Sequence, residues 1–398
     1  MLSKINSYAP QIVVFLLMST LCMTYFTDDV VMYQNIVYLL VFVLCLFSPR
    51  DNVEGRYSNF YKLMVVFVIL YSLRAFIELE VLGHKQELYG NNFTVYYFLF
   101  YGMFLPAIFI PKMKFDKTTK WWLVLIGVLI AISLTASAFN ILRGNIVLTN
   151  DQRIQGNERL SVIQYGHLGL TSVLIGVAMY LKNNIKFGKY ISLACIILGV
   201  FTMVVSGTRG AIISALLILA FYVFANARMR TFFIVLVGIL ILYFSLDNII
   251  SFMDSLGSNS AARIFRLFTE GGDQSSGRTE IWSRAINEII ESPLLGVSCF
   301  LHSNNSDITY VHNSFIEVTY ALGIFGLFVF TKANWLALMS CLQVLRSRNT
   351  EMLIFTFLFL QYFTYCLFSD SIIRMPLYWV FLFIMLGYKY KTTKKYEK

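Results

Sequence analysis

The sequence predicts an all-α polytopic membrane protein, a single membrane-embedded domain over residues 1–398 with about twelve transmembrane helices. Three observations predict this fold class. Hydrophobic residues make up 58% of the chain and charged residues only 14%, whereas a soluble domain carries about 25% charge. Mean hydropathy is +0.67, and long apolar runs recur along nearly the whole chain. Only one long polar connection, residues 251–312, interrupts them.

A transmembrane helix needs roughly 20 apolar residues to cross the ~30 Å hydrocarbon core. Twelve runs approach this length, and they cover residues 10–26, 30–48, 60–77, 93–111, 121–142, 160–181, 188–206, 210–227, 231–250, 313–331, 352–369 and 376–388. The apolar stretch 188–227 is too long for one helix. Residues 206–210, which read SGTRG, divide it as a tight turn with two flexible glycines. Residues 335–345 are predicted to extend the tenth helix inward.

The basic residues predict how the chain is oriented, because lysine and arginine collect on the cytoplasmic side of short connections. With the N-terminus inside, fifteen of the sixteen lysines fall on that side, and Lys85 is the exception. Both termini are then cytoplasmic, and residues 251–312 face the periplasm or exterior. The formal net charge of +10 is therefore a topology signal, and nucleic acid is not an expected partner.

Arginine is distributed differently from lysine. Ten of the sixteen arginines fall on the outer side: Arg74, Arg143, Arg153, Arg159, Arg209, Arg263, Arg266, Arg278, Arg284 and Arg374. Orientation alone requires no arginine there. Two interpretations stay open. Each arginine pairs with an acidic residue of that side, or several of them bind an anionic ligand through the rigid donor fork of the guanidinium group.

His312 is the histidine with the most informative position, because it stands where the long connection enters the tenth predicted span. A neutral imidazole there can take a proton from a sugar hydroxyl. The alternative is that His312, beside Asn313, merely caps the helix. His302, Asp307 and His312 fit no known metal-ligand spacing, so no metal site is predicted.

One amphipathic helix is predicted inside the long connection, because apolar residues recur with helical spacing over residues 279–292. Trp282 suits an interfacial position, and we expect this part of the loop to lie on the membrane surface as a lid. Arg278 immediately precedes the helix, where backbone N–H groups favour an anion. Arg209, in the turn between the seventh and eighth spans, contacts either a bound phosphate or the lipid phosphates.

Three stretches resemble one known family. Residues 312–326 read HNSFIEVTYALGIFG and resemble the H[N/S/Q]-x9-G-x-x-[G/T/Y] signature of bacterial O-antigen ligases. Residues 206–211, SGTRGA, look like the SGSRGA segment of the same superfamily, which also contains the Wzy-type polysaccharide polymerases. Residues 277–282 and 292–296, GRTEIW and SPLLG, resemble its GR…W…PLxG stretch. The matches occur in family order and cover about 206–330.

The resemblance implies an inverting glycosyltransferase of the membrane-embedded GT-C type, without metal or other cofactor, in the inner membrane of a bacterium. Its donor is a glycan on undecaprenyl diphosphate, and in a ligase its acceptor is a sugar hydroxyl of the lipid A–core. Carried over residue by residue, His312 activates that hydroxyl, while Arg209 and Arg278 hold the diphosphate. Arg159 is a weaker match to a family arginine before the sixth helix, because its local sequence RLSV departs from the family pattern.

Two other functions stay open. A Wzy-type O-antigen or exopolysaccharide polymerase uses the same donor and a second lipid-linked glycan as acceptor, although the x9-G-x-x-G spacing favours the ligase. A transporter of polysaccharide or lipid-linked glycan places its charged sites near the bilayer midplane, often within inverted repeats. Here Arg209, Arg278 and His312 are predicted at the outer edge, and the sequence shows no repeat. The expected partners are these glycolipids and the membrane lipids.

Overall fold

The computed structural model describes residues 2–48, 58–83, 91–113, 115, 120–149, 152–182, 188–226, 248, 251, 254–256, 258, 278–301, 310–347 and 349–396. The helices of the first part are α1 (Leu2–Ser19), η1 (Met23–Tyr25), α2 (Val30–Phe47), α3 (Ser58–Phe76), η3 (Ile77–Val81), α4 (Asn92–Phe98), η4 (Leu99–Phe104), α5 (Leu105–Phe109), η5 (Ile110–Lys112) and α6 (Lys120–Leu142). Here η3 and η4 are π-helical, and η1 and η5 are 3-10 helices.

A short antiparallel hairpin follows, formed by β1 (Val147–Leu148) and β2 (Ile154–Gln155). The remaining helices are α7 (Val162–Lys182), α8 (Gly188–Ser206), α9 (Arg209–Asn226), α13 (Arg278–Glu291), α14 (Ser314–Ser347), α15 (Leu353–Phe368), the 3-10 helix η6 (Ile372–Arg374) and α16 (Pro376–Tyr396). The sequence did not predict the hairpin, because two-residue strands carry no readable periodicity.

The chain is an all-α polytopic membrane protein. In the part of the chain that the structure describes, eight helices are long and apolar enough to cross a bilayer, and three shorter apolar helices accompany them at Tyr8–Ser19, Leu353–Phe368 and Pro376–Tyr388. These coincide with eleven of the predicted spans. The ninth, residues 231–250, lies almost entirely outside the described residues, so the count of twelve stays a prediction.

The boundaries differ from the prediction at two informative places. Helix α1 ends at Ser19 instead of near residue 26, and the Ser19 and Thr20 hydroxyls each donate to a backbone carbonyl of the preceding turn at 2.7 Å, bonds that compete with further helix. In the turn between α8 and α9, only Gly207 has a positive φ (58°). The prediction of two flexible turn glycines was wrong, because Gly210 lies inside α9.

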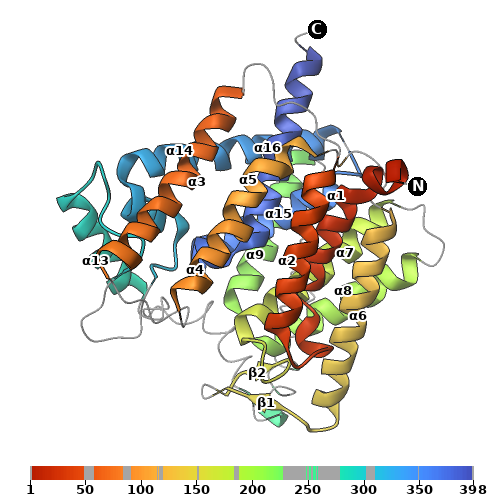
Figure 1. Ribbon diagram of the computed structural model, residues 1–398. Helices are drawn as coiled ribbons and strands as arrows, with labels where there is room; N and C mark the ends of the chain where they lie inside the picture. Colours follow the sequence, from red (N-terminus) through yellow and green to blue (C-terminus); the bar gives the residue numbers. More distant parts are fainter. Residues whose placement is uncertain are drawn as a thin grey trace.

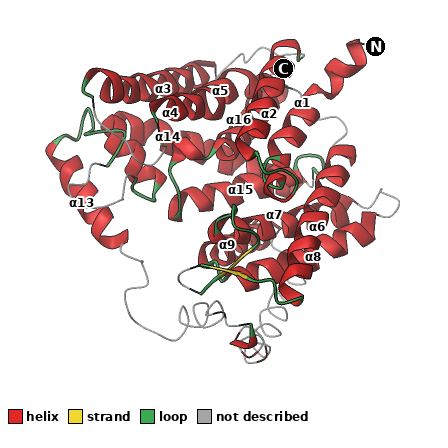
Figure 2. Ribbon diagram, turned by 60° about the horizontal axis from the view of Figure 1, so that its bottom comes forward, coloured by secondary structure: helices red, strands yellow, loops and turns green. Residues whose placement is uncertain are grey.

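Helices α15 and α16 form the centre of the bundle. Helix α16 packs against α14 and α15, and α15 against α7 and α9. Several of their large aromatic side chains, such as Phe359 and Trp379, are fully buried. Figure 1 shows α3, α4 and α5 on one flank and α6, α7 and α8 on the other, with both labelled chain ends towards the top and the β-hairpin at the bottom. In Figure 2, α13 lies at one edge, far from α6 and α8.

Helices α7 and α8 approach each other closely, which fixes α7 within the bundle. A Cβ atom at Gly169 would lie 2.7 Å from the Gly199 carbonyl oxygen, so neither helix tolerates a larger residue at this crossing. Ser192 Oγ on α8 donates to the Gly176 carbonyl at 2.6 Å. Small residues and hydroxyl hydrogen bonds of this kind hold helices together in membranes.

Candidate active site

Gly323 breaks α14 near the start of the helix. Its φ of 60° and ψ of −153° are not helical, and that region of conformational space is essentially restricted to glycine. A Cβ atom at this position would lie 2.3 Å from the carbonyl oxygen of Leu294, so no side chain fits. Helix α14 therefore begins with a short separate segment, residues 314–322, which continues directly from His312.

The turn after α13, residues 293–296, fits into this break. Ile324 N donates to the Pro293 carbonyl at 2.9 Å. Gly296 has φ 75°, and a Cβ atom there would lie 2.7 Å from the Tyr320 carbonyl oxygen. A broken membrane helix leaves backbone groups that need partners, and the turn supplies one of them. The SPLLG stretch and Gly323 of the histidine motif therefore form one structural unit.

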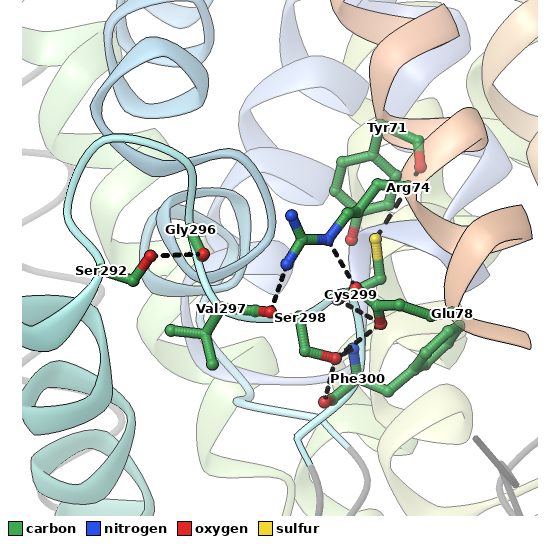
Figure 3. A network of polar contacts seen from close by, with 9 residues as sticks. All are labelled: Tyr71, Arg74, Glu78, Ser292, Gly296, Val297, Ser298, Cys299 and Phe300. Carbon is green, nitrogen blue, oxygen red and sulfur yellow. Dashed lines mark hydrogen bonds and ion pairs between the residues drawn. The ribbon is translucent and has the colours of Figure 1, made fainter. Parts of the chain in front are cut away.

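The segment after this turn is anchored to α3 and η3 by the network shown in Figure 3. Glu78 is only 2% exposed and accepts hydrogen bonds from Ser298 Oγ (2.6 Å) and Cys299 N (2.9 Å). Arg74 Nε also donates to Glu78 (2.7 Å), and the same guanidinium donates to the Val297 carbonyl. The carboxylate tolerates burial because these donors surround it.

The amphipathic helix predicted at 279–292 is confirmed as α13, and part of its apolar stripe packs against the protein. Trp282 Nε1 donates to the Val311 carbonyl at 2.8 Å, and Ala285 is buried beside Val311 and Tyr320. Two further residues of the stripe, Ile286 and Ile290, are exposed, so the expectation that this part of the loop lies on the membrane surface stays a prediction. Helical periodicity shows which residues share a face, but it does not show that part of this face is covered by the start of α14.

His312 has a left-handed backbone, with φ 58°, a conformation that is uncommon for a residue with a side chain. It does not cap α14. Asn313 does so, because its Oδ1 accepts hydrogen bonds from Phe315 N (3.0 Å) and Ile316 N (3.2 Å). The capping alternative for His312 is thereby removed, and its strained backbone is a feature found often at functional sites.

Burial, together with the positive charge of Arg278, lowers the pKa of His312 to about 4. With this pKa the imidazole is neutral near pH 7. The ring lies 4.2 Å from the ring of Tyr310, centroid to centroid. Its Nδ1 atom is buried without a hydrogen-bond partner among the described residues. A neutral imidazole is the form that can accept a proton.

Arg278 is the first residue of α13, and the structure brings it close enough to His312 for its charge to act on the imidazole. Burial lowers the pKa of Arg278, while Tyr310 opposes that shift. An arginine remains charged under these conditions. Arg278 therefore places a partly buried cation beside a neutral base, at a helix N-terminus where an anion is favoured.

Arg209 is the first residue of α9, and the turn before it is fixed to α7. Thr208 Oγ1 donates to the Val162 carbonyl at 2.9 Å. A Cβ atom at Gly166 would lie 2.5 Å from Thr208 Cβ, so this turn sits directly against α7. Arg209 thus stands at a helix N-terminus that is held in place by its neighbours, as a phosphate-binding position requires.

The end of α15 lies against both the residue after His312 and the first turn of α9. Asn313 Nδ2 donates to the Leu367 carbonyl at 3.4 Å, so the residue after His312 lies on the end of α15. Two residues further, Ser369 Oγ lies 3.9 Å from a Cβ atom built at Gly210, in the first turn of α9. The starts of α9 and α14 therefore both lie against the last turn of α15.

The connection from α15 to α16 contributes residues that the sequence prediction missed. Glu317 is buried in the first turn of α14 and accepts hydrogen bonds from the Ser371 hydroxyl and from Ile372 N (3.1 Å). Asp370 and Arg374 form an ion pair of 3.5 Å. Burial raises the pKa of Tyr310, and the charges of Asp370 and Arg374 act on it in opposite directions. Only Arg374, as an outer arginine, carried a signal in the sequence.

Arg159 lies in a different environment from Arg209 and Arg278. It is exposed, donates to the Thr27 carbonyl at 3.0 Å and forms an ion pair with Asp28. Three other outer arginines also pair with acids in the part of the chain that the structure describes: Arg74 with Glu78, Arg284 with Glu288, and Arg374 with Asp370. The salt-bridge interpretation therefore applies to these four.

These features define a class of protein: a multi-pass helical membrane protein with a neutral histidine and a partly buried arginine beside it. Residues 194–331 match the family model described as O-antigen ligase. The match confirms the family resemblance over that segment, which runs from within α8 to within α14 and contains His312, Arg209 and Arg278. Members of this superfamily are glycosyltransferase-like ligases and polymerases, which supports an enzymatic role. No curated protein matches the chain.

Proposed function

We propose that the protein is an O-antigen ligase-like glycosyltransferase of the bacterial inner membrane, with both termini cytoplasmic and residues 251–312 periplasmic. It transfers a glycan from undecaprenyl diphosphate to a sugar hydroxyl of the lipid A–core. The observation that carries the proposal is the neutral imidazole of His312 beside the Arg278 cation, inside the segment that matches the family. A base next to an anion-binding cation suits the attack of a hydroxyl on a diphosphate-activated sugar.

In the proposed reaction, the acceptor oxygen attacks the anomeric carbon of the glycan from the face opposite the diphosphate. The hydroxyl proton passes to His312, and the bond between the anomeric carbon and the phosphate oxygen breaks. Undecaprenyl diphosphate leaves, and the new glycosidic bond has the inverted configuration. General-base help from one histidine typically contributes 10²–10⁴-fold to the rate.

Arg209 and Arg278 are assigned to the diphosphate. Their positive charges stabilise the negative charge that develops on the leaving group, so the reaction requires no metal or other cofactor. The bound diphosphate also offsets the Arg278 charge that depresses the pKa of His312. His312 therefore becomes a stronger base when the donor is in place. Arg159 contributes at the edge of the site if it exchanges Asp28 for a phosphate oxygen.

A Wzy-type polymerase is the second candidate, because the same family match and the same donor site serve both reactions. The two differ only in the acceptor, which for the polymerase is a second lipid-linked glycan. A transporter of the lipid-linked glycan fits less well, since transport requires no base beside the anion site.

The test is a transfer assay with the purified protein in proteoliposomes, supplied with undecaprenyl-diphosphate-linked glycan, lipid A–core and EDTA. The proposal predicts glycan-bearing lipid A–core and free undecaprenyl diphosphate. Longer lipid-linked glycans formed from the donor alone would identify the polymerase instead. Failure of both transfers, with a protein that still binds the donor, would contradict the proposal, and loss of transfer on adding EDTA would contradict its metal independence.

A further inference from the structure

His167 is a second buried histidine, and its environment differs from that of an ordinary core residue. It lies on α7, is 4% exposed, and its ring stacks on Tyr365 of α15 with centroids 3.9 Å apart and planes 11° from parallel. Neither Nδ1 nor Nε2 has a hydrogen-bond partner among the described residues. Burial of an imidazole without partners costs free energy, so the ring nitrogens call for a partner from outside the chain.

The polar neighbours of His167 are already occupied by one another. Gln361 Nε2 donates to the backbone carbonyl of His167 at 2.8 Å, and Thr171 Oγ1 donates to the same carbonyl at 2.9 Å. Gln361 and Thr171 are also hydrogen-bonded to each other. The backbone carbonyl of His167 therefore has its hydrogen-bond donors in Gln361 and Thr171, whose side chains also bond each other. The imidazole of His167 bonds to neither of them.

That side chain points to the N-terminus of α9. A Cβ atom built at Gly210 would lie 3.5 Å from His167 Nε2, so the ring lies directly beneath the first turn of this helix, one residue from Arg209. Helix α9 has 18 residues, and the first N–H groups of such a helix have no partner within it. Backbone N–H groups, an arginine and an imidazole nitrogen therefore meet at one place.

We propose that His167 Nε2 donates a hydrogen bond to a phosphate oxygen of a lipid-linked diphosphate bound at the N-terminus of α9. This inference rests on the proposed function and adds a third binding residue to its donor site. The stack on Tyr365 fixes the plane of the ring, and the imidazole N–H supplies a hydrogen-bond donor. Gly210 adds no side chain beside the buried Nε2, whereas a Cβ atom at that position would lie 3.5 Å from it.

The test compares His167 variants in detergent micelles, with undecaprenyl diphosphate as the probe and its dissociation constant and the melting temperature of the protein as readouts. His167→Phe keeps the stack on Tyr365 but loses the donor. We expect it to weaken binding roughly ten- to hundredfold, the usual range for a hydrogen bond to a charged group. Its melting temperature should stay unchanged or rise, because an unpaired buried polar group is removed.

Two conservative variants identify the nitrogen. His167→Gln places an amide N–H near the position of Nε2 and should recover most of the affinity, whereas His167→Asn, which mimics Nδ1, should not. Gly210→Ala adds a methyl group at van der Waals distance from Nε2 and should weaken binding without lowering the melting temperature. Gly102→Ala is the matched control, with a Cβ atom 3.4 Å from Pro376, and should leave binding unchanged.

Binding by His167→Phe as tight as that of the unchanged protein, while Arg209→Ala weakens it, would overturn the inference alone. A lower melting temperature in all three His167 variants, in proportion to their loss of binding, would also overturn it, since His167 would then act only in packing. If the variants behave as expected but no glycan is transferred to either acceptor, the proposed function fails and the diphosphate site stands.

Discussion

Two polar regions of the protein are built in opposite ways. Around Glu78, a buried carboxylate is surrounded by donors from Arg74, Ser298 and Cys299. Around His312 and His167, buried ring nitrogens lack partners among the described residues. Both regions lie on the side of the bundle where α14 begins. The carboxylate of Glu78 finds its hydrogen-bond donors within the chain, whereas the buried ring nitrogens of His312 and His167 have no acceptor or donor among the described residues.

This difference in hydrogen bonding distinguishes a region that stabilises the fold from one that is suited to binding a ligand. Buried polar groups in folded proteins are nearly always hydrogen-bonded, so a satisfied network serves to fix the chain, and an unsatisfied group calls for a ligand. The Glu78 network holds the segment that follows the SPLLG turn, and that turn holds the break in α14. His312, just before α14, and His167, on α7 close to the start of α9, keep buried ring nitrogens without a partner among the described residues.

The largest effect on the transfer rate is expected at His312, whose buried Nδ1 lacks a partner among the described residues. His312→Ala removes the proposed base and should lower the transfer rate by 10²–10⁴-fold, measured with purified protein and lipid-linked donor. Membrane insertion and the melting temperature should be nearly unchanged, because Asn313, and not His312, caps α14. A His312→Ala protein with full activity would remove the proposed mechanism.

A similarly large effect, but on folding, is expected at the break in α14. Gly323→Ala would bring a Cβ atom to 2.3 Å from a backbone carbonyl oxygen and would force alanine into a conformation that costs about 1–3 kcal/mol before any steric term. We expect a markedly lower melting temperature and the loss of transfer. Gly102→Ala is the control, since it makes only ordinary contacts; equal melting temperatures for the two variants would show that the break is dispensable.

Substitutions in the network around Glu78 should change the stability of the protein. Glu78→Ala leaves Arg74 and buried N–H groups without an acceptor, and removal of one partner from a buried pair costs about 3 kcal/mol or more. Glu80→Ala, on the same π-helical turn but exposed, should cost less than about 1 kcal/mol. Thermal unfolding in detergent measures both, and a smaller loss for Glu78→Ala than for Glu80→Ala would refute the assigned role.

The smallest expected effect is a shift in pH dependence. His312 must be neutral to accept a proton, and its pKa is lowered to about 4. The acidic limb of kcat/KM should therefore lie below the usual histidine value of about 6.5, with activity falling as the pH drops towards 4. Arg278→Met removes a charge that disfavours the imidazolium, so the limb should move upward. A limb that stays in place or moves downward in that variant would contradict the electrostatic link.

The sequence predicted the helices well, because long apolar runs in a membrane have few alternatives to helix. The motifs also located His312, Arg209 and Arg278. The remaining features depend on contacts between distant parts of the chain. Glu78 and Ser298 are far apart in sequence, and nothing local to either indicates the other. The family signature marks Gly323, but the sequence does not show that the SPLLG turn packs against it.

Two features of the structure show what a local pattern leaves out. The apolar spacing of residues 279–292 identified α13, but it did not show that part of the stripe packs against the start of α14. Gly210 was assigned to a turn, and this prediction failed because Gly210 lies in α9, close to His167. The role proposed for His167 was also not evident from the sequence, because the position of its ring is fixed by Tyr365 from another helix.

The central claim is that Arg278 binds diphosphate, whereas Arg284, which is held in an exposed ion pair, does not. Helix α13 offers a direct comparison, because Arg278 begins it and Arg284 lies on it in an exposed pair with Glu288. The decisive measurement is the dissociation constant for undecaprenyl diphosphate of Arg278→Ala and Arg284→Ala, side by side in the same detergent. The account predicts at least a tenfold weakening for Arg278→Ala and no change for Arg284→Ala. Equal affinities for the two variants would contradict it.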